Sequence, residues 1–412
     1  MTSIIISIIS TAVGVLSIIL GTRRRKTDQS LELFKRVCAR IRTNYSELNA
    51  EALKVRQRHR DAELPELTKA GWIPETPLNL DDVSITLRDF DKEEHAIPPR
   101  TLRKMGAVLP RTKDGSRYRR YSEALADMSN EMNLFNGAIY RILDVASDSG
   151  HLALTFTAGN YFDHVDTSYL LTIESAIRRF NRNRGVLGGP YRRYIDDPFN
   201  LDRRAVGLGI NTLTIRRDVS ESGFYMHRRD KNNVTEAPEV VHVVPAGEFT
   251  PSSIGLEALK SDFDLWRNIV REYAEEFLDV EDAYGRTGRS VDFMRESPFR
   301  EMMLARQEGR LQVHFLGIGF DPLDWKPGLF TVCIFEARTF DRIFARLLNR
   351  KEKSVKGGKE GVILLGSNGR GIPFTRQNID LYAGNRNTVN AGVSCLRLAW
   401  RHRVALGLTA TQ

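Results

Sequence analysis

The sequence predicts an α+β fold in which a mixed β-sheet flanked by helices follows an α/β N-terminal domain and a single transmembrane helix. Three observations predict it. The chain opens on an uncharged aliphatic run at 3–21, and segments of alternating apolar residues recur between 207 and 338. Among these segments, the stretch 263–282 has an apolar residue at every third or fourth position, which is the pattern of one helix face.

Length and composition describe an ordinary globular protein. The 412 residues suffice for two domains or three, and 41% hydrophobic with 27% charged residues argue against a disordered chain. The net charge of +9 suits anionic partners such as phosphates, nucleic acid or anionic lipid, although a basic soluble surface has the same composition. The widely spaced Cys38, Cys333 and Cys395 argue against a disulfide scaffold and a cysteine-type zinc site.

The N-terminal run predicts a membrane anchor. Residues 3–21 approach the length of about 20 residues that crosses a bilayer, and the basic cluster 23–26 follows at once. Because positive charge stays on the cytoplasmic side, we expect a single-pass membrane protein with the bulk of the chain cytoplasmic. A cleaved or interfacial leader is the alternative. The predicted divisions are 1–26 for the anchor and its basic flank, 27–200 for a helical and α/β domain, and 201–412 for the C-terminal domain.

Helix and loop patterns fill the second division. A helix is predicted from about Ser30 to about Arg60, packing on the domain behind it, with a stalk or self-association into a homo-oligomer as alternatives. The segment 61–83 is a predicted linker or wrapping loop. The basic segment 100–125 interleaves arginine with tyrosine, which also occurs in single-strand binders, but a solvated loop is favoured and nucleic acid is the less favoured partner.

A strand at 151–157 and a helix to about Arg182 come next. Asp163, His164 and Asp166 open this helix. They suit either a metal or the positive end of the helix, and we favour capping.

Alternating apolar segments bounded by turn residues occur three times before the helix at 263–282 and twice after it. The predicted strands are 207–218, 223–230, 239–250, 311–321 and 329–338, and a last helix at about 389–405 closes the fold.

The helix at 263–282 carries a dense group of acids. Glu272, Glu275 and Glu276 crowd onto little more than one turn, so their carboxylates repel one another. Arg271, solvent or a divalent cation could compensate, since hard cations take oxygen ligands. An exposed acidic stripe without further function is the alternative.

These residues resemble the Nudix superfamily, whose box is a glycine loop followed by a helix with the pattern Arg-Glu-apolar-x-Glu-Glu. The segment 271-REYAEEF-277 supplies that pattern, and Gly247 ends the strand that stands where the family has its glycine loop. The resemblance covers roughly residues 205–340 and implies a Nudix-like mixed sheet flanked by helices.

The resemblance also implies an activity, the hydrolysis of a nucleoside diphosphate derivative with Mg²⁺ or Mn²⁺. The expected partner is then a nucleotide-type anionic small molecule, drawn in by the basic surface. The implied catalytic and metal-binding residues are Glu272, Glu275 and Glu276, with Arg271 as a structural ion-pair partner and Gly247 beside the substrate. His227 and Arg228, on the second strand, are candidate ligands of a substrate phosphate.

Three features depart from the family pattern. Phe263 stands where the family has a glutamate, with Asp262 and Asp264 as candidate substitutes. Leu278 replaces the glycine after the glutamate pair, and 251–261 is an insertion. These departures predict the alternative function, a non-catalytic Nudix-like module that senses a nucleotide or mediates an interaction, and signals to the membrane segment or to a partner protein.

Overall fold

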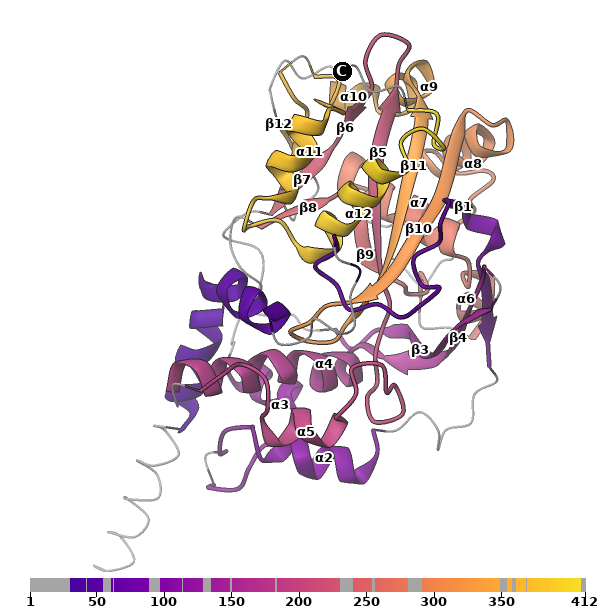
Figure 1. Cartoon of the computed structure of the whole chain (residues 1–412). Coiled ribbons are helices and arrows are strands. Elements are labelled where there is room, and N and C mark those ends of the chain that lie inside the picture. The colour runs from indigo at the N-terminus through magenta and orange to yellow at the C-terminus, as the bar shows by residue number, and fades with distance from the viewer. Residues whose placement is uncertain are drawn as a thin grey trace, which may run out of the picture.

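The computed structural model describes most of the chain between residues 30 and 408. The described residues are 30–41, 43–54, 61, 63–88, 97–112, 114–128, 135–148, 150–181, 184–229, 240–253, 256–280, 291–348, 354–357, 361–367 and 369–408. They contain three β-sheets with helices packed against them, so the predicted architecture of mixed α/β elements with sheets flanked by helices is confirmed (Figure 1).

The predicted membrane anchor requires a correction. No helix in the described part of the chain is long and apolar enough to cross a membrane. The helix α4 (Tyr161–Ala176), for example, has 16 residues and carries acids, whereas a span needs about 20 apolar residues. Residues 3–21, which the sequence pattern assigns to the transmembrane helix, lie outside the described residues. Within the described residues, the finding is therefore against the predicted transmembrane helix and single-pass membrane localisation, and neither is carried further.

The central sheet has seven strands among the described residues. They are β1 (Leu78–Asn79), β5 (Gly209–Arg217), β6 (Gly223–Phe224), β9 (Ala246–Glu248), β10 (Leu311–Phe320), β11 (Pro327–Glu336) and β14 (Ile372–Pro373). The order is β1-β10-β11-β5-β6-β14, and β9 also pairs with β5. β10 and β11 form an antiparallel hairpin, while β11 runs parallel to β5. All but the last residue of β5 and of β11 are buried, as expected for strands covered on both faces.

Two helices cover the opposite faces of this sheet, α7 (Leu265–Leu278) and α12 (Asn390–Arg401) (Figure 1). The side chains of β11 alternate between two hydrophobic clusters. Leu329, Cys333 and Phe335 pack in the cluster of α7, and Phe330, Val332 and Ile334 pack in that of α12. The sheet is therefore the middle layer of a three-layer sandwich.

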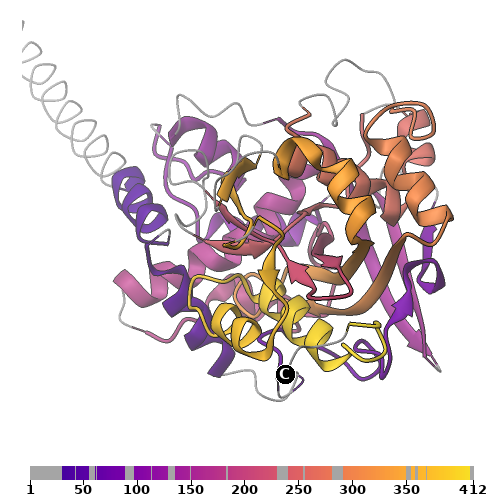
Figure 2. The ribbon, with the colours of Figure 1, turned by 90° about the horizontal axis from the view of Figure 1, so that it is seen from above.

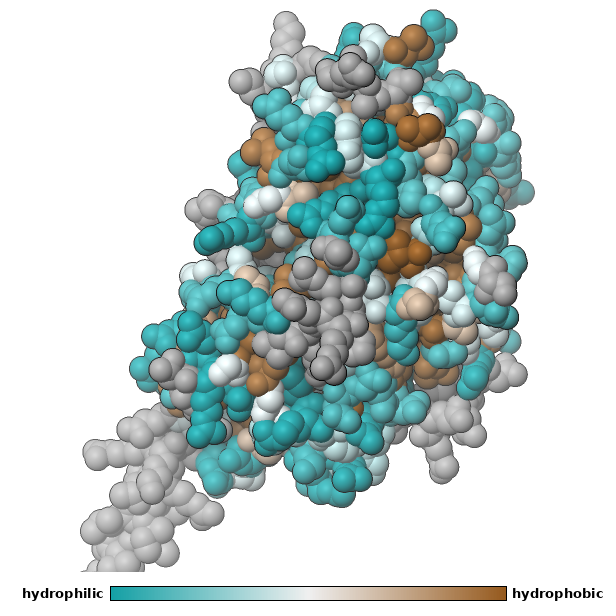
Figure 3. Space-filling view, viewed as in Figure 1, coloured by the Kyte–Doolittle hydropathy of each residue, from teal (hydrophilic) through white to brown (hydrophobic). Residues whose placement is uncertain are grey.

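Shorter helices complete these outer layers. They are α6 (Leu256–Ser261), α8 (Phe299–Gln307), α9 (Ala337–Ile343), α10 (Ala345–Leu348) and α11 (Arg376–Ala383). Seen from above, α11 and α12 lie together on one side of the sheet (Figure 2). The surface seen from that side is mainly hydrophilic, with hydrophobic residues in small separate patches (Figure 3).

Two smaller sheets flank the central one. The first has the order β12-β13-β7-β8, from β12 (Ser354–Gly357), β13 (Gly361–Leu364), β7 (Met226–Arg229) and β8 (Val241–Val243). The second has the order β2-β4-β3, from β2 (Ser84–Leu87), β4 (His151–Asn160) and β3 (Ala138–Asp148). The N-terminal part also contains helical residues 30–41 and 43–54, η2 (Leu80–Asp82), α2 (Pro99–Gly106), α3 (Tyr121–Met128), η3 (Ile177–Asn181) and α5 (Pro190–Ile195).

Asp61 and residues 63–79 form a strap that joins the N-terminal part of the chain to the central sheet. β1 pairs with β10 near the end of the strap. Earlier in the strap, Leu67 exchanges two backbone hydrogen bonds of 2.8 Å with Phe320. The strap begins at Asp61, whose carboxylate accepts two hydrogen bonds, of 3.0 and 3.1 Å, from Arg401 at the end of α12. The predicted wrapping loop is therefore a fixed part of the sheet.

The tip of the β10–β11 hairpin is a second junction. Trp325, at this tip, has a left-handed backbone (φ 60°) and is fully buried. The guanidinium of Arg192 lies 4.5 Å from its ring centroid, and the Arg204 side chain donates a 2.9 Å hydrogen bond to its carbonyl oxygen. The hairpin tip is thus held by two buried arginines that precede β5 in the chain.

Candidate functional site

Helix α7 carries the predicted site residues. Asp264 caps it, because its carboxylate accepts a 2.8 Å hydrogen bond from the Arg267 amide. The helix lies against β9 and in the aromatic core, so most of its residues are buried. Glu272 and Glu276 are only 4% and 5% exposed, while Glu275 is half-buried.

The two buried glutamates lie against the backbone of β9. A Cβ atom added to Gly247 would come within 2.2 Å of the carboxyl carbon of Glu272, so a side chain at this position would have to displace the carboxylate. Glu276 Oε2 accepts a 3.2 Å hydrogen bond from the amide of Ala246. The structure therefore brings Glu272, Glu276 and Gly247 together, and the Glu276 carboxylate bonds α7 to the strand.

Arg271 holds the chain where it leaves β9. Its guanidinium is fully buried and donates hydrogen bonds to the carbonyl oxygen of Thr250 and, at 2.7 Å, to Oδ1 of Asn268. The amide of Thr250 donates to the same Asn268 oxygen at 3.1 Å. These contacts join the Arg271 side chain to the segment after β9, and its role in an ion pair stays a prediction.

Phe263 occupies an aromatic cluster at the start of α7. Its ring centroid lies 5.1 Å from that of Tyr140 and 5.6 Å from those of Phe156 and Phe249. The flanking aspartates, which the sequence offers as substitutes for the family glutamate, have other partners. Asp262 accepts a 2.8 Å hydrogen bond from the Ser252 amide, and Asp264 is the cap of α7.

A divalent cation needs several oxygen ligands that converge on one point. In the described residues, which include all three glutamates of α7, no three His, Cys, Asp or Glu side chains gather so that they could hold a metal ion. The Mg²⁺ or Mn²⁺ ligation that the resemblance implies stays a prediction.

The other two candidate substrate ligands lie on β7. His227 is buried and stands directly opposite His242 of β8 in the strand register. Arg228 is exposed. Burial raises the pKa of Tyr382, a residue of α11 in the layer of α12, and the positive charge of Arg228 partly offsets this rise. A phosphate role for either residue stays a prediction.

Tyr273 is a buried residue that the helix pattern assigns only to the core. Its hydroxyl lies 2.6 Å from Thr214 Oγ1, and the Thr214 hydroxyl lies 2.6 Å from the carbonyl oxygen of Val244. Because the single hydroxyl hydrogen of Thr214 goes to that carbonyl, Tyr273 donates to Thr214. Burial is the largest cause that raises the pKa of Tyr273 well above its usual range, so it stays a neutral donor.

A polar contact joins α4, β9 and the tip of the β10–β11 hairpin through His164, Glu248 and Lys326. His164 Nδ1 accepts a 3.0 Å hydrogen bond from the Gly207 amide, so the proton of a neutral ring is on Nε2, which lies 3.8 Å from Glu248 Oε1. Lys326 pairs with the same Glu248 oxygen. The predicted capping by Asp163 and Asp166 is wrong, because the N-cap of α4 is Asn160 and makes no side-chain capping hydrogen bond. Both aspartates instead pair with Arg120, at 2.5 and 3.2 Å.

Comparison with known proteins assigns no family to this arrangement. No family model matches the chain, and no curated protein matches it significantly. The resemblance of residues 205–340 to the Nudix superfamily therefore remains a prediction from the residues themselves.

Proposed function

We propose that residues 205–340 form a non-catalytic Nudix-like module that binds a nucleotide-type anionic small molecule and relays the bound state to a partner protein. The order of elements supports a Nudix-like fold, because strands precede and follow α7, which covers one face of the sheet. The contact of Glu272 and Glu276 with the backbone of β9 carries the proposal of a non-catalytic module.

The lone pairs of these carboxylates decide between a metal site and a structural role. A hard cation in a hydrolase needs several oxygen ligands that point into one open site. Here Glu276 Oε2 accepts from a backbone amide, and Glu272 lies against Gly247. Phe263 brings an aromatic ring where the family brings a carboxylate. These residues stabilise the fold at the place where a hydrolase would hold its metal.

Hydrolysis of a nucleoside diphosphate derivative is the second candidate. The half-buried position of Glu275, beside two carboxylates that lie against β9, favours hydrolysis. In that case Glu272, Glu275 and Glu276 would hold Mg²⁺ or Mn²⁺, and the cation would polarise a water against the diphosphate.

The test combines a binding and a turnover measurement on the same samples. The full chain is mixed with a panel of nucleoside diphosphate derivatives, with and without Mg²⁺ or Mn²⁺, and its thermal unfolding and the released products are recorded. A ligand at 100 times its dissociation constant should stabilise the fold by about 2.7 kcal/mol, with no product formed.

Two results would overturn the proposal. Metal-dependent product that disappears in the double variant Glu275→Gln plus Glu276→Gln, while the variant still unfolds at the temperature of the parent chain, would establish the hydrolase instead. Glu257→Gln, an exposed acid on α6, is the matched control and should leave product unchanged. A panel in which no compound stabilises the chain or is cleaved would remove both candidates.

A further inference from the structure

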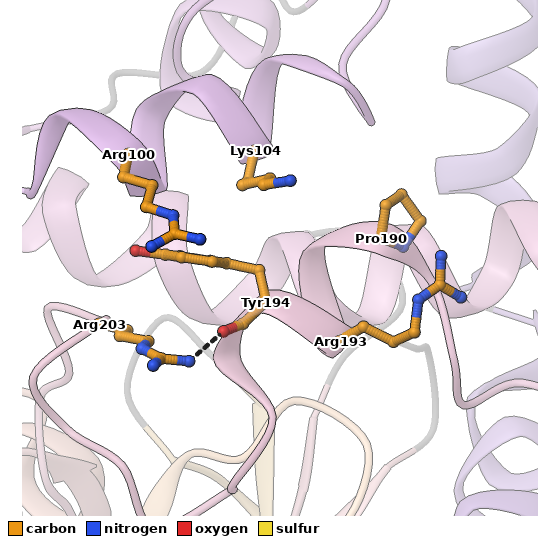
Figure 4. A pocket seen from close by; sticks show the side chains of 6 residues that line it. All are labelled: Arg100, Lys104, Pro190, Arg193, Tyr194 and Arg203. Carbon is orange, nitrogen blue, oxygen red and sulfur yellow. Dashed lines mark hydrogen bonds between the residues drawn. The ribbon is translucent and has the colours of Figure 1, made fainter.

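A basic pocket lies between α2 and α5 in the N-terminal part of the chain (Figure 4). It has a volume of about 340 Å³, within the usual range for small-molecule sites. Its lining contains four cationic residues and no acid. The lining residues are Arg100, Lys104, Pro190, Arg193, Tyr194 and Arg203.

The four cations of this lining have no acidic ion-pair partner among the residues that the structure describes. Arg100 and Lys104 are four residues apart on α2, a spacing at which like charges destabilise a helix. The first turn of α2 has no acid to offset them. A bound anion would relieve this repulsion.

The central side chain of the pocket is held in place. The Tyr194 hydroxyl lies 3.1 Å from Thr101 Oγ1, and the fully buried Thr101 hydroxyl also lies 3.1 Å from the carbonyl oxygen of Arg203. The Arg203 side chain donates a 2.5 Å hydrogen bond to the carbonyl oxygen of Tyr194. Figure 4 shows this bond, with Arg100 and Lys104 reaching from α2 toward α5.

Two guanidinium groups lie over the tyrosine ring. Those of Arg100 and Arg203 are 5.4 and 5.3 Å from the ring centroid of Tyr194. These cation–π contacts hold both side chains at the pocket without using their charge on a carboxylate. They also occupy the ring, so it is not offered to a nucleobase for stacking.

The α5 wall of the pocket is fixed by a buried carboxylate. Glu174 of α4 accepts hydrogen bonds of 2.8 Å from the Tyr191 amide and 2.9 Å from the Arg192 amide, at the start of α5. A Cβ atom on Gly189 would fall within 1.9 Å of the Glu174 carboxyl carbon, so the chain passes directly beneath it. Arg193 and Tyr194 therefore extend from a wall whose position is set before any ligand arrives.

We propose that this pocket binds the phosphate groups of a small phosphorylated molecule that carries more than one phosphate charge. Guanidinium groups match phosphate oxygens with two parallel hydrogen bonds, and three of the four cations are arginines. A free polyphosphate, a nucleotide tail and a lipid phosphate headgroup share this chemistry. The pocket has no residue in common with α7, so phosphate binding here does not depend on whether the module around α7 binds a ligand.

Calorimetric titration of the full chain with inorganic pyrophosphate tests the proposal. The double variant Arg100→Gln plus Lys104→Gln should weaken binding by about tenfold or more, because it removes two charge-assisted contacts. The matched control is Arg103→Gln plus Arg119→Gln, which removes the same charge from exposed positions outside the lining and should change the dissociation constant less than about twofold. Unchanged thermal unfolding in both variants shows that they are folded.

Further arms of the experiment identify the source of the phosphate. Vesicles with phosphatidic acid that bind the chain, and are displaced by pyrophosphate, would assign the site to a lipid headgroup. Vesicles with equally charged phosphatidylserine are the control. Absence of pyrophosphate binding, an equal loss in both double variants, or binding only to a single-stranded oligonucleotide would overturn the proposal.

Discussion

Gly247 offers the sharpest test of the contact between α7 and β9. In Gly247→Ala the new methyl carbon would lie 2.2 Å from the carboxyl carbon of Glu272 and 2.3 Å from both carboxylate oxygens. Ordinary van der Waals contacts of a Cβ atom begin near 3.4 Å, so the carboxylate must move by about 1 Å. Glu272 is buried, and its carboxylate therefore cannot swing into solvent without opening the helix–strand contact.

The expected loss is that of an overpacked core. Inserting one methyl group into a closely packed site costs about 1–3 kcal/mol, and we expect this for Gly247→Ala. Glu272→Ala removes the group that the methyl meets. The double variant should therefore lose less than the sum of the two single losses, with a coupling of about 1–2 kcal/mol.

Urea unfolding followed by circular dichroism measures all four members of this cycle. Gly106→Ala is the matched control, since a Cβ there would meet only an ordinary 3.7 Å contact with the Tyr118 carbonyl oxygen. It should be neutral or slightly stabilising. A Gly247→Ala variant as stable as the parent chain, or single losses that simply add, would refute the packing of Glu272 on Gly247.

Three further perturbations have defined outcomes. Burial raises the pKa of the Asp166 carboxyl to about 6, so the folded chain keeps a proton that the unfolded chain loses. The contribution of the Asp166 carboxyl to the free energy of unfolding should fall by about 2–3 kcal/mol as pH rises from about 4 to about 6. The difference in stability between the parent chain and Asp166→Asn, measured by urea unfolding, should follow this fall. A difference that does not change with pH would contradict it. Trp325→Ala should lower the free energy of unfolding by about 3–5 kcal/mol, because it empties the space between two buried arginines; a loss below about 1 kcal/mol would argue against that junction. Glu174→Gln should cost about 1–2 kcal/mol through the weakened cap of α5, whereas Glu47→Gln at an exposed ion pair should cost under about 1 kcal/mol; equal losses would be inconsistent with the cap.

The sequence predicts the central layer well because its elements obey simple periodicities. β5, β10 and β11 fall inside the predicted segments or within two residues of them, and α7 occupies the apolar pattern within 263–282. Strands covered on both faces must be apolar nearly throughout, and a helix on such a sheet needs one apolar face. Local pattern alone fixes both.

The partners of the polar side chains could not be predicted in the same way. The spacing of Glu272 and Glu276 places them on one helix side but does not reveal that the opposing surface is the bare backbone of Gly247. Likewise, Arg100 and Arg203 are about a hundred positions apart, and only the packing of α2 against α5 puts both over Tyr194. Such contacts depend on tertiary packing, for which a single sequence has no local signal.

The strap formed by Asp61 and residues 63–79 has a consequence for solubility. β10 would otherwise present an outer row of unpaired backbone groups, which is a template for association with another chain. β1, Leu67 and the carbonyl oxygen of Trp72 take up donors and acceptors along that edge, the last through a 3.1 Å bond from the Ile318 amide. A fragment that begins after residue 80 would expose this edge, so it should self-associate through β10 even where its own core remains folded.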